Sequence, residues 1–156
     1  MAEITLTTTL SCHPDKAWAR VQTSALLLHV AFPMIRFTPM NNRSLPRVWK
    51  PGEYRVRMWL FGFIPIGWQA VVISEPEPEG DKRFIRDNGY GPLVRRWDHL
   101  ITIAPGERGT TLYTDRVIIE AGVLTPVIAM FAELFYAFRQ RRWRELATSD
   151  FRALKG

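Results

Sequence analysis

Hydrophobic and polar residues alternate along several short stretches of the chain, and a period of two is typical of β-strands. The first stretch runs from Glu3 to Leu10, with Ile4 and Leu6 on one side and threonines on the other. Later stretches cover residues 54–60, 68–74, 82–87, 94–103 and 110–120. Turn-forming residues separate them, so we predict an antiparallel sheet of about six strands. Residues 37–51 contain three prolines and no clear period, and we expect an irregular arm there.

Helix signals occur after the first strand and near the end of the chain. Pro14 suits the first turn of a helix, and a second short helix is expected over Ser24–Ala31 with Ser24 as its cap. Thr125-Pro126 begins a stretch that continues to about Leu146 without a helix-breaking residue. This order of elements predicts an α+β fold in which a curved antiparallel sheet wraps around a long C-terminal helix.

The composition narrows the class of protein. The 156 residues are 47% hydrophobic and 12% aromatic, which is enough for one domain, 1–156, with a substantial core. Large aromatic side chains also line apolar pockets, so their number favours a fold with a cavity. The single Cys12 excludes an intrachain disulfide and a cysteine-rich metal site, and we expect a reducing, cytoplasmic location.

The net charge of +6 arises in a chain in which seventeen of the twenty-one basic residues are arginine. An anionic partner is therefore considered, but most arginines are spread over the predicted strands and no nucleic-acid-binding motif accompanies them. We interpret the one dense run, Arg139–Arg144, as the solvated face of a helix, with an anion-binding site as the alternative. The longest apolar region, Val117–Phe138, is interrupted by Glu120 and Glu133, so we expect no integral membrane segment. The first residues, Met1–Leu6, have no basic region followed by an apolar stretch, so we expect no signal peptide.

Several short motifs follow one another along the chain: Ile4–Leu10 followed by Pro14–Trp18, Gly91-Pro92 followed by Trp97–His99, Gly109–Thr111 followed by Thr114–Val117, and the long closing helix. In this order they resemble the motifs of the START-related, birch-pollen-allergen-like (SRPBCC) superfamily, and within it those of the polyketide cyclase/dehydrase-like proteins. The resemblance covers essentially the whole chain and implies a helix-grip fold. It implies less about function, because such proteins range from lipid carriers to cyclases to hormone receptors. Relatives often carry a second histidine two residues after the first, where this chain has Ile101.

His99 lies in the predicted strand 94–103 at the same parity as Trp97, so the two side chains share one face of the sheet. If the connecting turn covers residues 105–109, His99 is expected opposite Asp115 on the next strand. A buried carboxylate needs a partner, and an imidazole can supply an N–H donor.

The same register puts Asp98 opposite Arg116 on the outer face, as a surface ion pair worth about 0–1 kcal/mol. The inward pair has two interpretations. His99 and Asp115 form either a polar couple that fixes the strand register, or a site in which His99 acts as general acid or base with its ring oriented by Asp115.

The predicted closing helix is apolar nearly all round, with one charged residue between positions 127 and 138. A helix that lies on one sheet needs only one apolar stripe, so something else must cover its second face. The hairpin tip Phe61–Ile66 is also apolar, which favours a cavity mouth or a dimer contact there. The residues predicted to line a ligand cavity are Tyr54, Met58, Trp68, Trp97, His99, Tyr113, Asp115, Ile128, Phe131 and Phe135.

The sequence lacks metal-ligand spacing, a phosphate loop and a dinucleotide fingerprint, so we expect neither a metal nor a cofactor. It therefore predicts a carrier or sensor that binds a hydrophobic or amphipathic small molecule, or a lipid, as a monomer or homodimer. The alternative is a cyclase- or dehydratase-like enzyme that uses His99 as acid or base. A third hypothesis is peripheral membrane contact, in which the tip Phe61–Ile66 and the run Arg139–Arg144 dock together on anionic lipid.

Overall fold

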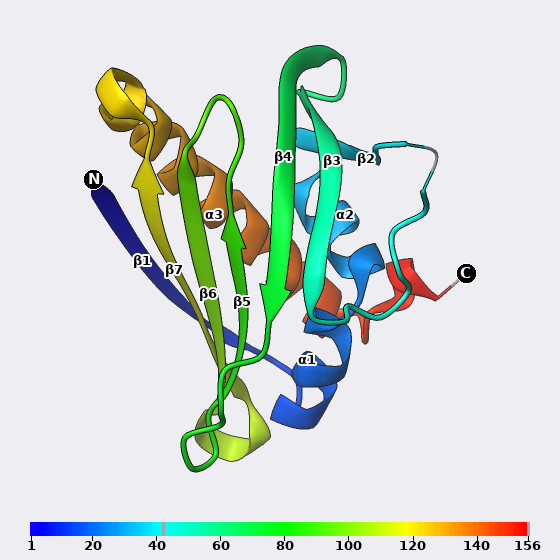
Figure 1. Cartoon of the computed structure of the whole chain (residues 1–156). Helices are drawn as coiled ribbons and strands as arrows, with labels where there is room; N and C mark the ends of the chain where they lie inside the picture. Colours follow the sequence, from blue (N-terminus) through cyan, green and yellow to red (C-terminus); the bar gives the residue numbers. More distant parts are fainter. Residues whose placement is uncertain (42, 156) are drawn as a thin grey trace.

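The computed structural model describes residues 1–41 and 43–155, and these form an antiparallel sheet with helices against one face (Figure 1). The strands are β1 Ala2–Leu10, β2 Ile35–Pro39, β3 Gly52–Leu60, β4 Ile64–Ser74, β5 Arg83–Gly89, β6 Arg96–Pro105 and β7 Thr111–Glu120. The α-helices are α1 Pro14–Val21, α2 Ser24–Ala31 and α3 Thr125–Thr148. The seven strands follow the order β1-β7-β6-β5-β4-β3-β2, so the predicted α+β architecture is confirmed.

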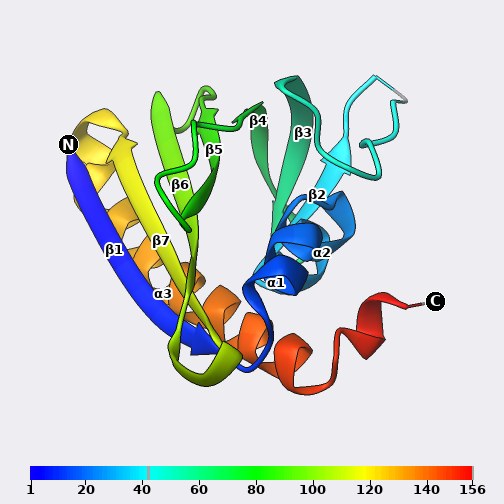
Figure 2. The same cartoon turned by 90° about the horizontal axis from the view of Figure 1, so that it is seen from below.

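The sheet is strongly curved, as the view from below shows (Figure 2). Helices α1 and α2 lie inside the curve, and α3 packs along β1 and β7. The structure has one strand more than predicted, because β2 takes in residues 37–39 of the expected irregular arm. β2 is an edge strand that pairs only with β3, and an edge position tolerates Pro39, which lacks an N–H group.

The N-terminus of α2 differs by one residue from the prediction. The cap is Thr23 rather than Ser24, because the Thr23 hydroxyl oxygen accepts a hydrogen bond from the backbone N–H of Leu26 at 3.3 Å. Helix α1 begins as predicted, with Pro14 in its first turn, and α3 extends two residues beyond Leu146. These helix ends position the short helices over the open side of the sheet.

The register of β6 against β7 differs by two residues from the prediction. Gly106 N–H donates to the carbonyl of Thr110, which closes a tight connection over Glu107–Gly109 and carries the strand pairing further into the predicted turn. Arg108 and Gly109 take positive φ values of 55° and 74° there. This turn geometry fixes the register of the whole hairpin.

As a consequence, His99 lies opposite Val117, and Asp98 lies opposite Ile118. The predicted direct pairings of His99 with Asp115 and of Asp98 with Arg116 are therefore wrong. A shift of two residues leaves every side chain on its predicted face, whereas a shift of one would have reversed them all. His99 and Asp115 thus remain on the same inner face as diagonal neighbours, because Asp115 lies two residues along β7 from the residue opposite His99.

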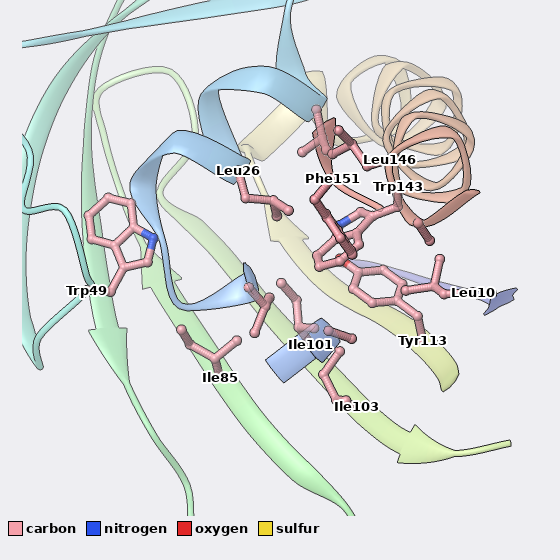
Figure 3. Close-up of a cluster of buried hydrophobic side chains, with 14 of the residues drawn as sticks. Leu10, Leu26, Trp49, Ile85, Ile101, Ile103, Tyr113, Trp143, Leu146 and Phe151 are labelled. Carbon is pink, nitrogen blue, oxygen red and sulfur yellow. The ribbon is translucent and has the colours of Figure 1, made fainter. Parts of the chain in front are cut away.

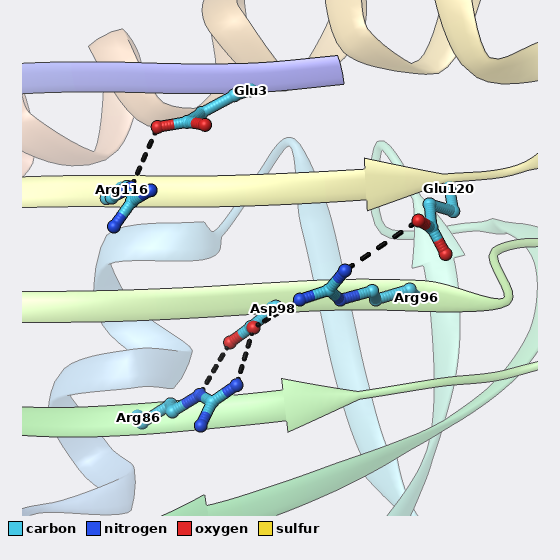
Figure 4. Close-up of polar contacts among 6 residues, drawn as sticks. All are labelled: Glu3, Arg86, Arg96, Asp98, Arg116 and Glu120. Atoms are coloured by element: carbon cyan, nitrogen blue, oxygen red, sulfur yellow. Dashed lines mark hydrogen bonds and ion pairs between the residues drawn. The ribbon is translucent and has the colours of Figure 1, made fainter. Parts of the chain in front are cut away.

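Asp98 finds different partners on the outer face of the sheet (Figure 4). Arg86 donates to it from Nε at 2.8 Å and Nη2 at 2.7 Å, and Arg96 donates at 3.2 Å. These hydrogen bonds, that of Arg86 foremost, lower the pKa of the Asp98 carboxyl although burial opposes the shift. Arg116 instead pairs with Glu3 of β1 at 2.8 Å.

Two clusters of buried apolar side chains fill the space between the sheet and the helices. The first lies beneath α1, α2 and the C-terminal half of α3, and includes Tyr113 and Trp143 (Figure 3). The second lies beneath the first half of α3 and includes Val117 and Tyr136. The residues between the two clusters on β7 and α3 are polar, and they bring the functional candidates together.

Candidate functional site

A cavity of about 330 Å³ lies between the concave face of the sheet, α2 and α3. Its size is at the lower end of the range for small-molecule sites, about 300–1,000 Å³. The walls are mostly apolar and come from both core clusters, among them Leu26, Trp49, Met58, Val71, Ile85, Ile101, Trp97, Ile128, Phe131 and Phe135. A few polar side chains also reach the cavity, namely Gln69, Asp87, His99 and Arg139.

The structure separates the predicted wall residues into two groups. Those that line the cavity are Met58, Trp97, His99, Ile128, Phe131 and Phe135. Tyr113 and Asp115 are fully buried behind His99, and Tyr54 packs edge-on against Trp49 while its hydroxyl donates to the carbonyl of Lys50. Whether the lining residues contact a ligand stays a prediction.

Trp68 faces away from the cavity because of an irregularity in the β3–β4 hairpin. It pairs with Arg57, and its ring lies beneath the Arg55 guanidinium, 4.8 Å from the centroid. The pairing register between β3 and β4 shifts between Arg57 and Trp59, and this irregularity interrupts the in-and-out alternation of side chains along β4. As a result Ile66 lines the cavity, although strict alternation would turn it outward. A bulge of this kind cannot be read from the alternation of residue types alone.

His99 and Asp115 are joined by a hydrogen bond of 2.6 Å between Nε2 and Oδ1. Tyr113 donates to the same carboxylate at 2.9 Å, and Gln140 of α3 donates to its other oxygen at 3.1 Å. Gln140 also donates to the carbonyl of Leu6 in β1 at 2.8 Å. This polar network therefore links β1, β6, β7 and α3 between the two apolar clusters.

The surroundings set the charges in this network. Burial would raise the pKa of the Asp115 carboxyl, but the hydrogen bond from His99, together with Arg139 and Gln140, holds it below its ordinary value. Burial lowers the pKa of His99, and Asp115 opposes that shift. We therefore assign an ionised Asp115 and a neutral His99 whose Nε2–H donates to it. The His99 ring also lies 4.8 Å from the ring of Tyr136.

Arg139 is a site residue that the sequence interpretation missed. It belongs to the run read as a solvated helical face, yet its side chain is only 4% exposed and lines the cavity. Helical spacing contained the signal, because Arg139 lies four residues after Phe135 and four before Trp143, both of which are buried. The interpretation of the whole run as solvated is therefore wrong, since Gln140 and Trp143 are buried as well.

Asp87 is the second polar residue that sequence reasoning missed. It lies directly opposite His99 on β5 and therefore faces the cavity, and its Oδ1 accepts a hydrogen bond from the backbone N–H of Val72 at 2.8 Å. Burial raises the pKa of its carboxyl to about 7, although the Val72 N–H and Arg139 favour the ionised form. Its two-residue offset from Ile85 was the available signal, because strand parity puts both on the inner face.

Within residues 1–41 and 43–155, no group of three His, Cys, Asp or Glu side chains lies close enough to hold a metal ion. Cys12 is half-buried, and burial raises the pKa of its thiol. The polar groups of the cavity can therefore donate or accept hydrogen bonds and carry charge, but they form no clustered ligand set in this part of the chain.

Helix α3 leaves much of its first half uncovered. The segment Gly122–Thr148 is long and apolar enough to cross a membrane by length and composition, since an 18-residue window within it has a mean hydropathy of 1.3, and only 28% of that window is buried. The core helix of a globular protein passes the same test, and α3 packs Phe135 and Tyr136 into the second apolar cluster. Its exposed apolar side chains are Val123, Leu124, Val127, Met130 and Leu134.

The β3–β4 tip is exposed at the same end of the molecule as the start of α3 (Figure 1), with Phe63 72% exposed. Part of the basic run is engaged within the protein. Arg139 is buried, Arg142 donates to the carbonyl of His29, and Arg144 donates to Thr8. Membrane contact by the tip and the run together stays a prediction.

A curved antiparallel sheet closed over a cavity by a long C-terminal helix defines the helix-grip fold of the START-related superfamily. Solved structures share it over nearly their whole length. Protein CV1439 from Chromobacterium violaceum is 17% identical, with a TM-score of 0.64 over 93% of this chain and 96% of that one. A START superfamily protein from Mycobacterium smegmatis is 11% identical, with a TM-score of 0.59 over 94% and 97%. The AHSA1 protein from Silicibacter pomeroyi is 16% identical, with a TM-score of 0.60 over 95% and 99%.

At these identities the likeness establishes the fold alone. The chain belongs to the family described as domain of unknown function DUF8410, which matches residues 8–147. No curated protein matches it significantly. Its activity therefore has to be argued from the cavity.

Proposed function

We propose that this protein binds a hydrophobic or amphipathic small molecule in the cavity between the sheet and α3. The observation that carries the proposal is the largely apolar cavity of about 330 Å³, which has a small number of polar groups on its wall. Protein interiors are otherwise close-packed, and a space of this size with convergent polar groups is typical of ligand sites. The START-related fold supports the same proposal.

A panel of apolar and amphipathic compounds is expected to raise the melting temperature. A ligand that binds only the folded state, at a hundred times its Kd, adds about 2.7 kcal/mol to the free energy of unfolding. For a chain of this size that corresponds to a rise of about 5–10 °C. The measurement is differential scanning fluorimetry, confirmed by calorimetric titration of each compound that gives a shift.

Filling the cavity should remove this response. Ile101→Phe adds volume at the cavity wall, so the ligand-induced shift should be lost while the protein remains folded. Leu112→Phe makes the same type of change on the exposed side of β7 and should leave the shift intact. A shift that survives in Ile101→Phe would place the binding site elsewhere, and a panel without any binder would overturn the proposal.

A second candidate function is a cyclase- or dehydratase-like reaction with His99 as acid or base. It is favoured by the position of His99 at the cavity wall with its Nε2 bonded to Asp115. For a carrier, His99→Gln should change the affinity for a ligand found in the panel by less than about threefold, because hydrogen bonding is partly retained. Calorimetric titration of both proteins tests this.

The enzyme candidate makes a different prediction for the same variant. Wild-type protein incubated with the ligand should convert it to a product of altered mass or altered ring closure, and His99→Gln should bind it without conversion. Chromatography with mass spectrometry separates the two. A ligand recovered unchanged from the wild type contradicts the enzyme candidate.

A further inference from the structure

The Arg139 guanidinium is a buried positive charge at the cavity wall. Its side chain is 4% exposed, and its Nε atom has no hydrogen-bond partner among the described residues. An ion pair with Arg139 is likewise absent from residues 1–41 and 43–155, where every carboxylate lies more than 4.0 Å from it. A buried donor without an acceptor is unusual, and for a charged donor it is particularly unfavourable.

The neighbours of Arg139 hold the guanidinium without neutralising it directly. Its central carbon lies 5.2 Å from the ring centroid of Tyr136 and 5.7 Å from that of Phe135. Stacking on aromatic faces leaves the N–H edges of a guanidinium available for an acceptor. The Tyr113 hydroxyl lies close enough to raise the pKa of Arg139, and the same hydroxyl donates to Asp115 at 2.9 Å.

The carboxylate of Asp115 is a negative charge that acts on Arg139, and its oxygens already have donors. Oδ1 accepts from His99 and Tyr113, and Oδ2 accepts from Gln140. Asp87 faces the cavity from the sheet and has its Oδ1 engaged by the backbone of Val72. The guanidinium is therefore oriented by its surroundings and lacks the planar acceptor that its N–H groups are arranged to bind.

We propose that the cavity binds a compact amphipathic carboxylate whose acid group pairs with the Arg139 guanidinium while its hydrocarbon body lies against the apolar walls. This rests on the proposed function and adds the chemical class of the ligand. A carboxylate matches a guanidinium because two parallel N–H groups can bind its two oxygens. The cavity wall is mostly apolar and includes Ile85 and Ile101 of the first cluster and Val94 and Phe131 of the second.

Two matched pairs of probes test the class of ligand: decanoate against decanol, and naphthoate against naphthol. Each pair shares one hydrocarbon body and differs in the acid group. The wild-type protein is expected to bind at least one carboxylate about tenfold more tightly than its alcohol in calorimetric titration. Equal affinities within both pairs would overturn the inference and leave the proposed function standing. Failure of all four probes, together with failure of the wider panel, would overturn both.

Variants of Arg139 then assign the preference to this side chain. Arg139→Gln should reduce the preference for the carboxylate over its alcohol to about twofold or less, while the alcohol binds as before. Arg139→Lys should give an intermediate preference, because it keeps the positive charge and loses the two parallel N–H donors of the guanidinium. Arg141→Gln is the matched control, since Arg141 is 71% exposed and pairs with Glu145. A preference retained by Arg139→Gln would overturn the assignment. Circular dichroism melting checks that each variant folds, and the wild-type comparison remains decisive if one does not.

Discussion

Replacing Asp115 with alanine is expected to lower the free energy of unfolding by about 3–5 kcal/mol, because it removes one partner from a buried, charged network. His99 and Tyr113 would lose the acceptor that each has at 2.6 and 2.9 Å, respectively. Gln140 would keep its second bond to Leu6 and lose less. Urea denaturation followed by tryptophan fluorescence measures the loss.

The effect should depend on pH in a defined direction. The folded-state pKa of Asp115 is depressed, so its contribution is complete above the unfolded value of 3.8 and is lost as pH falls toward the folded value. The difference between wild type and Asp115→Ala should therefore shrink in acid. Asp81→Ala, in an exposed turn, is the control and should change stability by less than about 0.5 kcal/mol. A loss below about 1 kcal/mol for Asp115→Ala, which is the value of one neutral hydrogen bond, would contradict the network's role.

The second large effect is expected at Asp87, with the opposite dependence on pH. Its folded-state pKa is raised from 3.8 to about 7, so the native state holds a proton that the unfolded chain releases. Stability should therefore fall as pH rises from 3.8 to about 7. Asp87→Asn keeps an oxygen for the Val72 N–H and cannot ionise. It should be about 2–4 kcal/mol more stable than wild type above pH 7, where the lower figure allows for solvent screening of a half-buried carboxyl.

Denaturant titrations between pH 4.5 and 8.5, roughly the range over which Asp87 changes charge, measure this difference. The groups that act on Asp87 are Arg139 of α3, which favours ionisation, and Asp98 of β6, which opposes it. Asp98→Asn serves as the control. Its carboxylate is ionised and bonded to Arg86, so this substitution should destabilise the protein at neutral pH. If Asp87→Asn gained no stability relative to wild type with rising pH, a protonated, half-buried Asp87 would be contradicted.

Alternation along the chain was sufficient to predict the sheet and the inner face of His99, but not the pairing of individual residues. Parity survives any even shift of register, so the positive-φ turn at Arg108 and Gly109 displaced the His99 pairing without turning its side chain outward. β2 was missed in part because it is a short edge strand that ends in Pro39.

The polar wall of the cavity was harder to predict, for physical reasons. A run of arginines normally marks a solvated helical face, and only the spacing between Phe135, Arg139 and Trp143 distinguishes the buried member of the run. Trp68 looked like a wall residue because of its type, but the β3–β4 irregularity turned it outward. Residue type therefore predicted the apolar character of the cavity, while local backbone geometry decided which side chains reach it.

The place of β1 in the sheet has a consequence for how the chain folds. β1 pairs only with β7, so Thr7 finds its partner Thr114 across 107 positions of sequence. Contacts of such long separation slow folding, because chain entropy is lost before the contact forms. At about 5–20 residues per second, a ribosome needs about 5–20 s to make the intervening segment. During that time β1 has no partner strand. Its alternating apolar side chains stay unpaired until β7, in the last third of the chain, has been synthesised.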